Sequence, residues 1–246
     1  MRRMFTLLHK SSDPNCFLRL YAEFRSDLAW WLAFASSWNG VSFLQLSGST
    51  EPSAVFYTDA SGSWGCGALW GSCWLQGHWP SQWADMSIMV KELVPIVCAA
   101  AVWGPSWTGL HVLCYCDNMS VVHVLNKGSS REPSGVVMHS LRTLTFFSAI
   151  FGFVLRAQHV AGLNNGPADA ISRDNLSLLF SQVPNAAREQ TPIPEELWTL
   201  LVREQPDWLS ERWRNLFTSF CRRVWPVPQK DPMSQASADS CPSVIE

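Results

Sequence analysis

Three strand-like runs follow one another early in the chain, and this succession limits the possible folds more than any other feature of the sequence. The runs cover residues 54–58, 64–70 and 73–79. Turn residues separate them, including the Gly71-Ser72 corner, so antiparallel pairing of the three runs is the simplest interpretation. A sheet that starts this way needs helices to cover it.

Helical and strand-like patterns alternate after the third run. The predicted elements are a helix over 86–103, a strand over 110–116, helices over 118–125 and 133–149, a strand over 151–158 and a helix over 167–173. The pattern predicts an α/β fold with a mixed five-stranded sheet, three antiparallel strands first, and helices on both faces. Pro95 removes a backbone donor inside the first helix, so we expect a kink or a late start there.

The predicted sheet domain occupies residues 52–176 of the 246-residue chain. Residues 1–51 precede it, and apolar side chains recur at helical spacing over 17–46. Residues 177–246 follow it as a proline-rich linker that ends in a disordered tail. Two short helical patches are predicted within this linker, at 195–203 and 210–220.

Composition excludes some classes of function. Charged residues make up only 15% of the chain, hydrophobic residues 47%, and the formal net charge is −2. A disordered chain and a strongly cationic nucleic-acid-binding protein are therefore excluded, whereas a nuclease that holds nucleic acid locally is not. The sequence contains no long apolar span and no secretory signal pattern, so we expect an intracellular protein, cytoplasmic or nuclear, without a membrane partner.

The eight cysteines are scattered and form no Cys-x-x-Cys or His/Cys pattern. Structural zinc sites require such ligand spacings, so the sequence predicts none and favours reduced, buried thiols. Cys114 and Cys116 form the closest pair, and they point to one face because they alternate along a predicted strand.

Four of the seven acidic residues between 54 and 175 lie at element ends that this topology brings together. They are Asp59, Glu92, Asp117 and Asp169. An acid at the end of an apolar strand is costly to bury without a partner, and converging acids raise one another's pKa. A divalent cation removes that cost, and an all-oxygen ligand set favours Mg²⁺ or Mn²⁺ over zinc.

Each acid taken alone has a simpler interpretation. Asp59 suits a turn and Glu92 a solvated helix face. Asp117 suits a helix N-cap, and Asp169 suits the first turn of a helix through the helix dipole. The ordered occurrence of all four on one frame favours a shared metal site.

Four segments around these acids resemble the active-site blocks of the ribonuclease H domain of retroelement reverse transcriptases. The segments are 57–61 (YTDAS), 91–93 (KEL), 116–118 (CDN) and 159–173 (HVAGLNNGPADAISR). The last block is similar to the form found in gypsy-like and DIRS-like retrotransposons. The flanking segments 24–31, 37–40 and 208–217 resemble those beside the domain in DIRS-like elements. The resemblance covers essentially residues 17–220 and implies a ribonuclease H-like fold.

The resemblance also implies a two-metal nuclease that hydrolyses the RNA strand of RNA–DNA hybrids. Asp59 would bridge two Mg²⁺ ions, for which Mn²⁺ is a possible substitute. Asp169 would hold the ion that activates the attacking water. Glu92 and Asp117 would hold the ion nearer the leaving 3′-oxygen. Two ions at this spacing clamp the attacking and leaving oxygens of an in-line displacement.

Further site residues follow from the same resemblance. The family places a mobile histidine ten residues before the last acid, which is His159 here, and implies a role in proton handling or product release. The alternative is a histidine at a strand end that bonds a backbone carbonyl. Ser61, Asn118 and Asn165 are candidate substrate contacts, although Asn165 suits holding its loop better.

The chain departs from its bacterial-type relatives in how it would grip a substrate. Those relatives carry an extra basic helix, and only residues 128–132 separate the corresponding helices here. The span 54–175 holds six Lys/Arg against seven Asp/Glu, which gives a net charge of −1. Because affinity for nucleic acid depends largely on phosphate neutralisation, we expect weak unaided binding of hybrid.

The polymerase is missing from the sequence: no Tyr-x-Asp-Asp motif occurs, and the 53 residues before Ala54 are too few for a palm domain. We therefore expect a fragment of a retroelement polyprotein, with the reverse transcriptase polymerase domain as its partner. The alternative function is a catalytically weak or silent remnant that at most binds nucleic acid. A transposase or integrase is disfavoured because its glutamate lies on a late helix, whereas Glu92 precedes Asp117.

Overall fold

The computed structural model describes residues 7, 9–10, 12–13, 15–37, 51–132 and 135–203. The chain divides into two compact units. One contains helix α2 (Ala22–Ser37), which falls within the helix predicted over 17–46. The other contains the sheet and its helices. The predicted helical patch at 210–220 and the predicted disordered tail lie outside the described residues.

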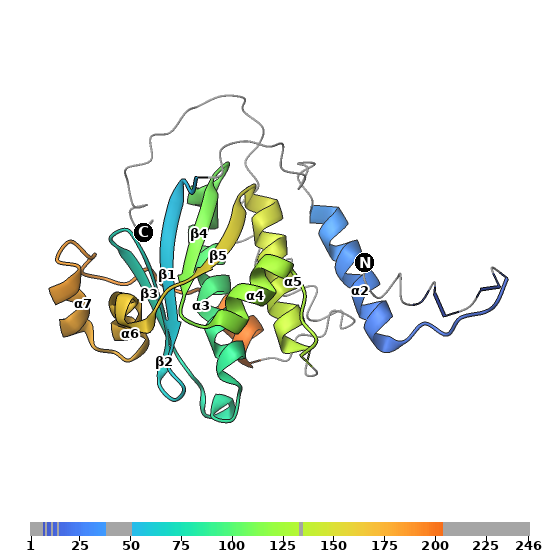
Figure 1. The fold of residues 1–246 in the computed structure, drawn as a ribbon, viewed down its shortest axis with the longest axis horizontal. Helices are drawn as coiled ribbons and strands as arrows, with labels where there is room; N and C mark the ends of the chain where they lie inside the picture. Colours follow the sequence, from blue (N-terminus) through green and yellow to red (C-terminus); the bar gives the residue numbers. More distant parts are fainter. Residues whose placement is uncertain are drawn as a thin grey trace. The chain divides into compact units, whose positions relative to one another are not determined.

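Five strands form one mixed sheet in the order β3-β2-β1-β4-β5 (Figure 1). The strands are β1 (Ala54–Ala60), β2 (Gly65–Trp70), β3 (Cys73–His78), β4 (His111–Cys116) and β5 (Val154–His159). β1, β2 and β3 pair antiparallel, and β4 and β5 continue the sheet parallel to β1. The predicted α/β fold, a mixed five-stranded sheet with its three antiparallel strands first, is confirmed.

Helices cover both faces of this sheet (Figure 1). One face carries α3 (Ile88–Trp103), α4 (Met119–Lys127) and α5 (Val136–Phe151). The other face carries α6 (Gly166–Ser172) and α7 (Leu176–Gln182). The remaining elements are single turns, η1 (Ser81–Trp83), η2 (Gly104–Trp107) and η3 (Gly162–Asn164), and the short α8 (Glu195–Trp198) with the turn Thr199–Arg203 after it.

Capping residues explain where helices α3 and α4 begin. Ser87 is the N-cap of α3, and its side chain accepts a hydrogen bond from the Val90 N–H. Asn118 caps α4 in the same way, accepting from the N–H groups of Ser120 and Val121. Pro95 lies inside α3, which continues as one helix from Ile88 to Trp103. The helix starts two residues later than predicted and is not interrupted by the proline.

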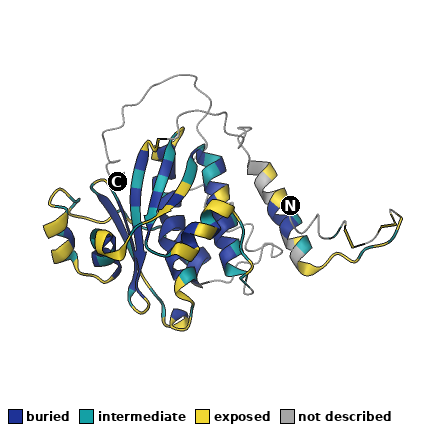
Figure 2. Cartoon of the chain, in the orientation of Figure 1, coloured by how far each residue is buried: buried dark blue, intermediate teal, exposed yellow. Residues whose placement is uncertain are grey.

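The main core lies between the sheet and α3, and Figure 2 shows α3 and the inner strands as mostly buried. Aromatic rings fill this core. The centroid of the Trp107 ring lies 5.0 Å from that of the Phe56 ring and 5.4 Å from that of the Phe153 ring. The segment Ile88–Trp107 is long and apolar enough to cross a membrane, but 78% of its apolar window is buried inside the fold. That is the environment of a core helix.

Several cysteines belong to this core. The described free thiols are Cys16, Cys66, Cys98, Cys114 and Cys116, and all but Cys16 are buried. The expectation of reduced thiols is wrong for Cys73, which is disulfide-bonded.

Residues after α6 pack back against the sheet. Leu179 of α7 joins Leu69 and Trp74 in a second apolar cluster. The chain then follows the edge strand β3, where the N–H of Ala187 donates to the carbonyl of Ser72 at 2.8 Å and that of Thr191 to Trp74 at 2.7 Å. The part of the predicted linker that the structure describes, 177–203, therefore covers an otherwise open sheet edge.

Close packing of α6 on β2 makes Gly67 a sensitive position. A Cβ at Gly67 would lie 2.4 Å from a side-chain methyl of Ile171 and 3.0 Å from the backbone nitrogen of Ser172. We expect Gly67→Ala to lower the free energy of unfolding by about 1–3 kcal/mol, because α6 must move outward. Urea unfolding measures this. Gly62→Ala is the matched control, because nothing lies within 4 Å of its added Cβ, and an equal loss in both variants would contradict the argument.

Candidate metal centre

The four predicted acids come from four different elements that meet at one edge of the sheet. Asp59 lies next to the last residue of β1, and Asp117 directly follows β4. Because β1 and β4 are parallel neighbours, with Thr58 paired to Cys116, their carboxyl ends meet. Glu92 comes from the second turn of α3, on one face of the sheet. Asp169 comes from the first turn of α6 on the other.

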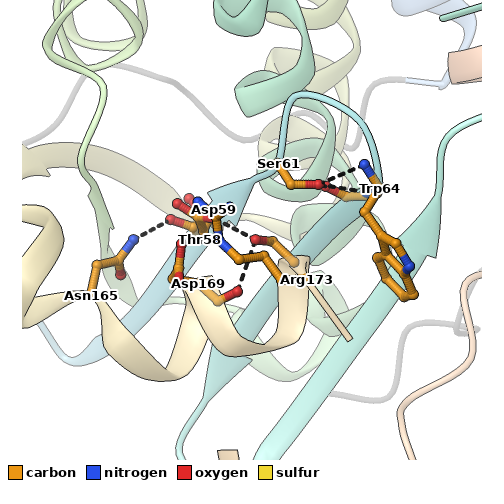
Figure 3. A network of polar contacts seen from close by, with 9 residues as sticks. Thr58, Asp59, Ser61, Trp64, Asn165, Asp169 and Arg173 are labelled. Carbon is orange, nitrogen blue, oxygen red and sulfur yellow. Dashed lines mark hydrogen bonds and ion pairs between the residues drawn. The ribbon is translucent and has the colours of Figure 1, made fainter. Parts of the chain in front are cut away.

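Asp59 is the most central of these acids and is only 4% exposed. The hydroxyl of Ser172 donates to its Oδ2 at 2.5 Å, and Figure 3 shows the carboxylate beside Asp169 and Arg173. Burial raises the pKa of Asp59 to about 6, and the charges of Asp117 and Asp169 also raise it. The Ser172 hydrogen bond and the Arg173 charge act in the opposite direction.

Glu92 is buried to the same extent, with 4% of its surface exposed. Burial raises its pKa to about 9, and the charges of Asp59 and Asp117 raise it further. Hydrogen bonds from the Ala60 N–H and from the Cys116 thiol, at 3.9 Å, partly oppose this effect. The charge of Asp59 therefore acts on Glu92 across the centre.

The potential ligand atoms of Glu92, Cys116 and Asp117 all lie within 4.8 Å of one another. This set contains two of the predicted acids and adds a thiol that the sequence reasoning did not include. Asp59 and Asp169 do not belong to that compact set, but both act on the same centre through their charges. The structure therefore brings all four acids into one electrostatic unit and three ligand groups into direct proximity.

Asp169 is partly exposed, unlike the buried Asp59 and Glu92. Its Oδ1 accepts from Nε of Arg173 at 2.6 Å, one helical turn on, and the two side chains are 40% and 61% exposed. The Arg173 charge also acts on Asp59 and Asp117. The protein therefore supplies one cation of its own at the rim of the acidic centre.

His159 lies at the end of β5, beside Asp117. The ring is exposed, and its Nε2 is 3.1 Å from the backbone carbonyl oxygen of Asp117. This is the contact of the simpler interpretation, a strand-end histidine on a backbone carbonyl. The position next to an acid of the centre also suits proton handling, and that role stays a prediction.

Asn165 is fully buried, and its side chain links the start of α6 to β1. Its Nδ2 donates to the carbonyl of Thr58 at 2.9 Å, one residue before Asp59, and its Oδ1 is buried without a partner among the described residues (Figure 3). The side chain therefore holds the α6 loop against β1, and none of its surface is available to a substrate.

Ser61 and Asn118 are also engaged within the protein. The Ser61 hydroxyl donates to the Gly65 carbonyl and accepts from the N–H groups of Trp64 and Gly65, which closes the β1–β2 turn (Figure 3). The Asn118 side chain caps α4 but remains partly exposed. Their predicted contacts with substrate stay predictions, and Asn118 is the more accessible of the two.

Sequence reasoning missed four residues that shape the centre. They are Lys91, Cys116, Ser172 and Arg173. The ammonium of Lys91 is buried and donates to the carbonyls of Gly62 and Ala84, so it ties the β1–β2 turn to α3. All four adjoin a predicted acid or lie one helical turn from it, which is the signal that could have identified them.

The ligand chemistry of the centre fits divalent cations. Four carboxylates converge, and two of them, Asp59 and Glu92, have pKa values raised by burial and by repulsion from the neighbouring acids. A divalent ion would relieve that repulsion, and hard carboxylate oxygens suit Mg²⁺ or Mn²⁺. At this edge the side chains of Asp169 and His159 are accessible to solvent.

No protein-family model matches the chain, and neither does any curated protein. Among solved structures, the chain is similar to LC11-RNase H1, solved in complex with an RNA/DNA hybrid, at 14% identity and a TM-score of 0.39. That match covers 51% of this chain and 99% of the other. It is also similar to RNase H1 from the halophilic archaeon Halobacterium salinarum, at 15% identity and a TM-score of 0.37, covering 50% and 96%.

Proposed function

We propose that this protein is a ribonuclease H-type endonuclease that hydrolyses the RNA strand of RNA–DNA hybrids with Mg²⁺. One observation carries the proposal: Asp59, Glu92, Asp117 and Asp169 converge at one edge of a ribonuclease H-like sheet. Two of the acids are held at raised pKa, which is typical of functional sites.

The position of each acid determines which metal ion it would hold. Asp59 is central and would hold both ions, Asp169 would hold the one on the water side, and Glu92 and Asp117 the one on the side of the leaving 3′-oxygen. When bound, two such ions polarise the phosphate, lower the pKa of water and stabilise the leaving oxygen. The fold fixes the carboxylates in advance through the Ser172 bond to Asp59 and the Ala60 bond to Glu92. His159, exposed at the rim, would move a proton there.

We further propose a retroelement origin, in which the chain is part of a reverse transcriptase polyprotein and acts inside the cell beside a polymerase domain. The four sequence blocks and their order support this context. The low positive charge supports a polymerase partner, because residues 54–175 carry a net charge of −1 and phosphate neutralisation must come from elsewhere.

A silent remnant of the same fold is the second candidate. The same shortage of positive charge favours it, since a chain that cannot hold hybrid cannot cleave it. The acids themselves give no reason for inactivity, because all four are present at the centre.

The function is tested by cleavage of a labelled hybrid by the purified chain. We expect RNA-strand cleavage with millimolar Mg²⁺, none in excess chelator, and none on a DNA duplex of the same sequence. A supplied polymerase fragment is a second arm, and we expect it to raise the rate at low hybrid concentration. Cleavage that is unchanged by chelator would contradict the metal mechanism, and inactivity in every arm would favour the remnant.

A prediction about metal affinity concerns Arg173. Its guanidinium competes with a metal for Asp169, so Arg173→Gln is expected to tighten Mn²⁺ binding by up to about fivefold, because exposed ion pairs contribute about 1 kcal/mol at most. Isothermal titration measures the affinity. Arg156→Gln, an exposed arginine on β5, serves as the control, and equal affinities in both variants and wild type would show that Arg173 does not oppose the metal.

A further inference from the structure

Cys116 introduces a soft ligand into a centre otherwise made of hard carboxylate oxygens. It is the last residue of β4, fully buried, and its Sγ lies 3.9 Å from Oε2 of Glu92. The ligand atoms of Glu92, Cys116 and Asp117 are all within 4.8 Å of one another. In a tetrahedral zinc site, bond lengths of about 2.0–2.3 Å place neighbouring ligand atoms roughly 3.5 Å apart. Small side-chain adjustments therefore bring these three groups around one ion.

The backbone holds the Cys116 sulfur in place beside the two carboxylates. The N–H of Asn118, at the start of α4, donates to its Sγ at 3.4 Å. Burial and the charge of Glu92 raise the pKa of the free thiol, so the ion itself must displace the proton. The neighbouring carboxylates of Glu92 and Asp117 then supply the oxygen ligands. Carboxylate–thiolate sets select Zn²⁺ and related thiophilic ions, whereas Mg²⁺ takes oxygen ligands alone.

We infer that Glu92, Cys116 and Asp117 form a site for a thiophilic divalent cation of the Zn²⁺ class, and that its occupancy excludes Mg²⁺ from the same acids and inhibits the enzyme. On binding, the Cys116 S–H bond is broken, the sulfur bonds the ion, and the proton passes to solvent. The binding part of this inference stands on the cluster alone. The inhibition part rests on the proposed function.

Cd²⁺ is the probe, because a cadmium–thiolate bond gives an ultraviolet charge-transfer absorption that carboxylates do not. The full-length chain, free of metal and with the Cys73 disulfide intact, is titrated with Cd²⁺ as wild type, Cys116→Ser, Cys116→Ala and Cys98→Ser. Cys98 is the matched control, since it is a buried free thiol on α3 outside the cluster. Circular dichroism of each variant confirms that it is folded, and the alanine variant covers a folding failure of the serine one.

The expected result is a charge-transfer absorption in wild type and Cys98→Ser that is reduced by one thiolate in both Cys116 variants. The Cd²⁺ affinity of the site falls at least tenfold in those variants, and excess Mg²⁺ lowers the wild-type absorption by competition. An absorption and affinity unchanged by Cys116→Ser, or lost equally in Cys98→Ser, would overturn the inference.

Hybrid cleavage separates this inference from the proposed function. Each chain's own Mg²⁺-supported rate is the reference, and we expect Cd²⁺ to inhibit wild type at a concentration at least tenfold below that needed for Cys116→Ser. If no chain cleaves hybrid but the Cys116-dependent absorption is present, the nuclease proposal fails and the metal site stands. If cleavage occurs and both chains have the same Cd²⁺ sensitivity, the inhibitory role is wrong.

Discussion

Replacing Asp59 by asparagine is expected to reduce Mg²⁺-dependent cleavage of an RNA–DNA hybrid by at least about a thousandfold. Asp59 is buried between the other acids, under the charges of Asp117 and Asp169 and acting on Glu92, so its loss would remove a ligand from both proposed ions. Transition-state stabilisation by bound metal is worth several kcal/mol, and about 1.4 kcal/mol corresponds to a factor of ten in rate. Single-turnover cleavage of labelled hybrid measures the loss.

Unfolding does not explain such a loss. Asparagine is isosteric, still accepts the Ser172 hydrogen bond, and removes a carboxylate whose charged form is disfavoured by burial. The variant is therefore expected to be at least as stable as wild type. Asp85→Asn, on an exposed loop, is the matched control and should cleave at the wild-type rate. Wild-type activity in Asp59→Asn would refute the catalytic assignment, and equal inactivity of wild type and variant would favour the silent remnant.

Much of the fold and of the centre could be predicted because both depend on short-range pattern. Strand runs bounded by turn residues, and helices with a cap at Ser87 or Asn118, are encoded within a few positions. The acids could be predicted because an acid after an apolar strand, such as Asp117, is costly without a partner. The topology then brings the ends of β1 and β4 to the same edge.

The remaining features depend on contacts between distant segments, which one sequence does not display. The packing of 177–203 along β3 is of this kind. Prolines in that segment suggested a linker, but Trp198 packs on Gly77, where its ring fills the space that a Cβ would need. Asn165 is a different case. The sequence favoured a role in holding its loop over a substrate contact, and its buried amide donates to the carbonyl of Thr58.

The metal-free protein is expected to lose stability as pH rises, with Glu92 as the main cause. Its pKa is about 9 in the folded chain against an ordinary value of 4.5, and that of Asp59 is about 6 against 3.8. Between each pair of values the folded state holds more protons than the unfolded state, so the free energy of unfolding falls with pH. Each unit of pKa difference corresponds to about 1.4 kcal/mol, so Glu92 contributes about twice as much of this loss as Asp59.

Thermal unfolding at pH 5 and pH 8, in chelator and in excess Mg²⁺ or Mn²⁺, measures this loss and its relief. In chelator, we expect the midpoint temperature of unfolding to be lower at pH 8 than at pH 5. The metal raises it more at pH 8, because ions compete with protons for the carboxylates. Glu92→Gln, which keeps a side-chain oxygen for the Ala60 N–H, flattens the pH dependence and weakens the response to metal. Glu189→Gln, at an exposed position, is the control and is expected to keep the wild-type pH dependence and the wild-type response to metal. The same pH slope in all three chains would mean that the buried carboxylates are not the source. A second outcome would contradict the nuclease proposal. If the unfolding temperature of Glu92→Gln does not change with pH and that of wild type does not respond to metal, the centre binds protons but not metal ions.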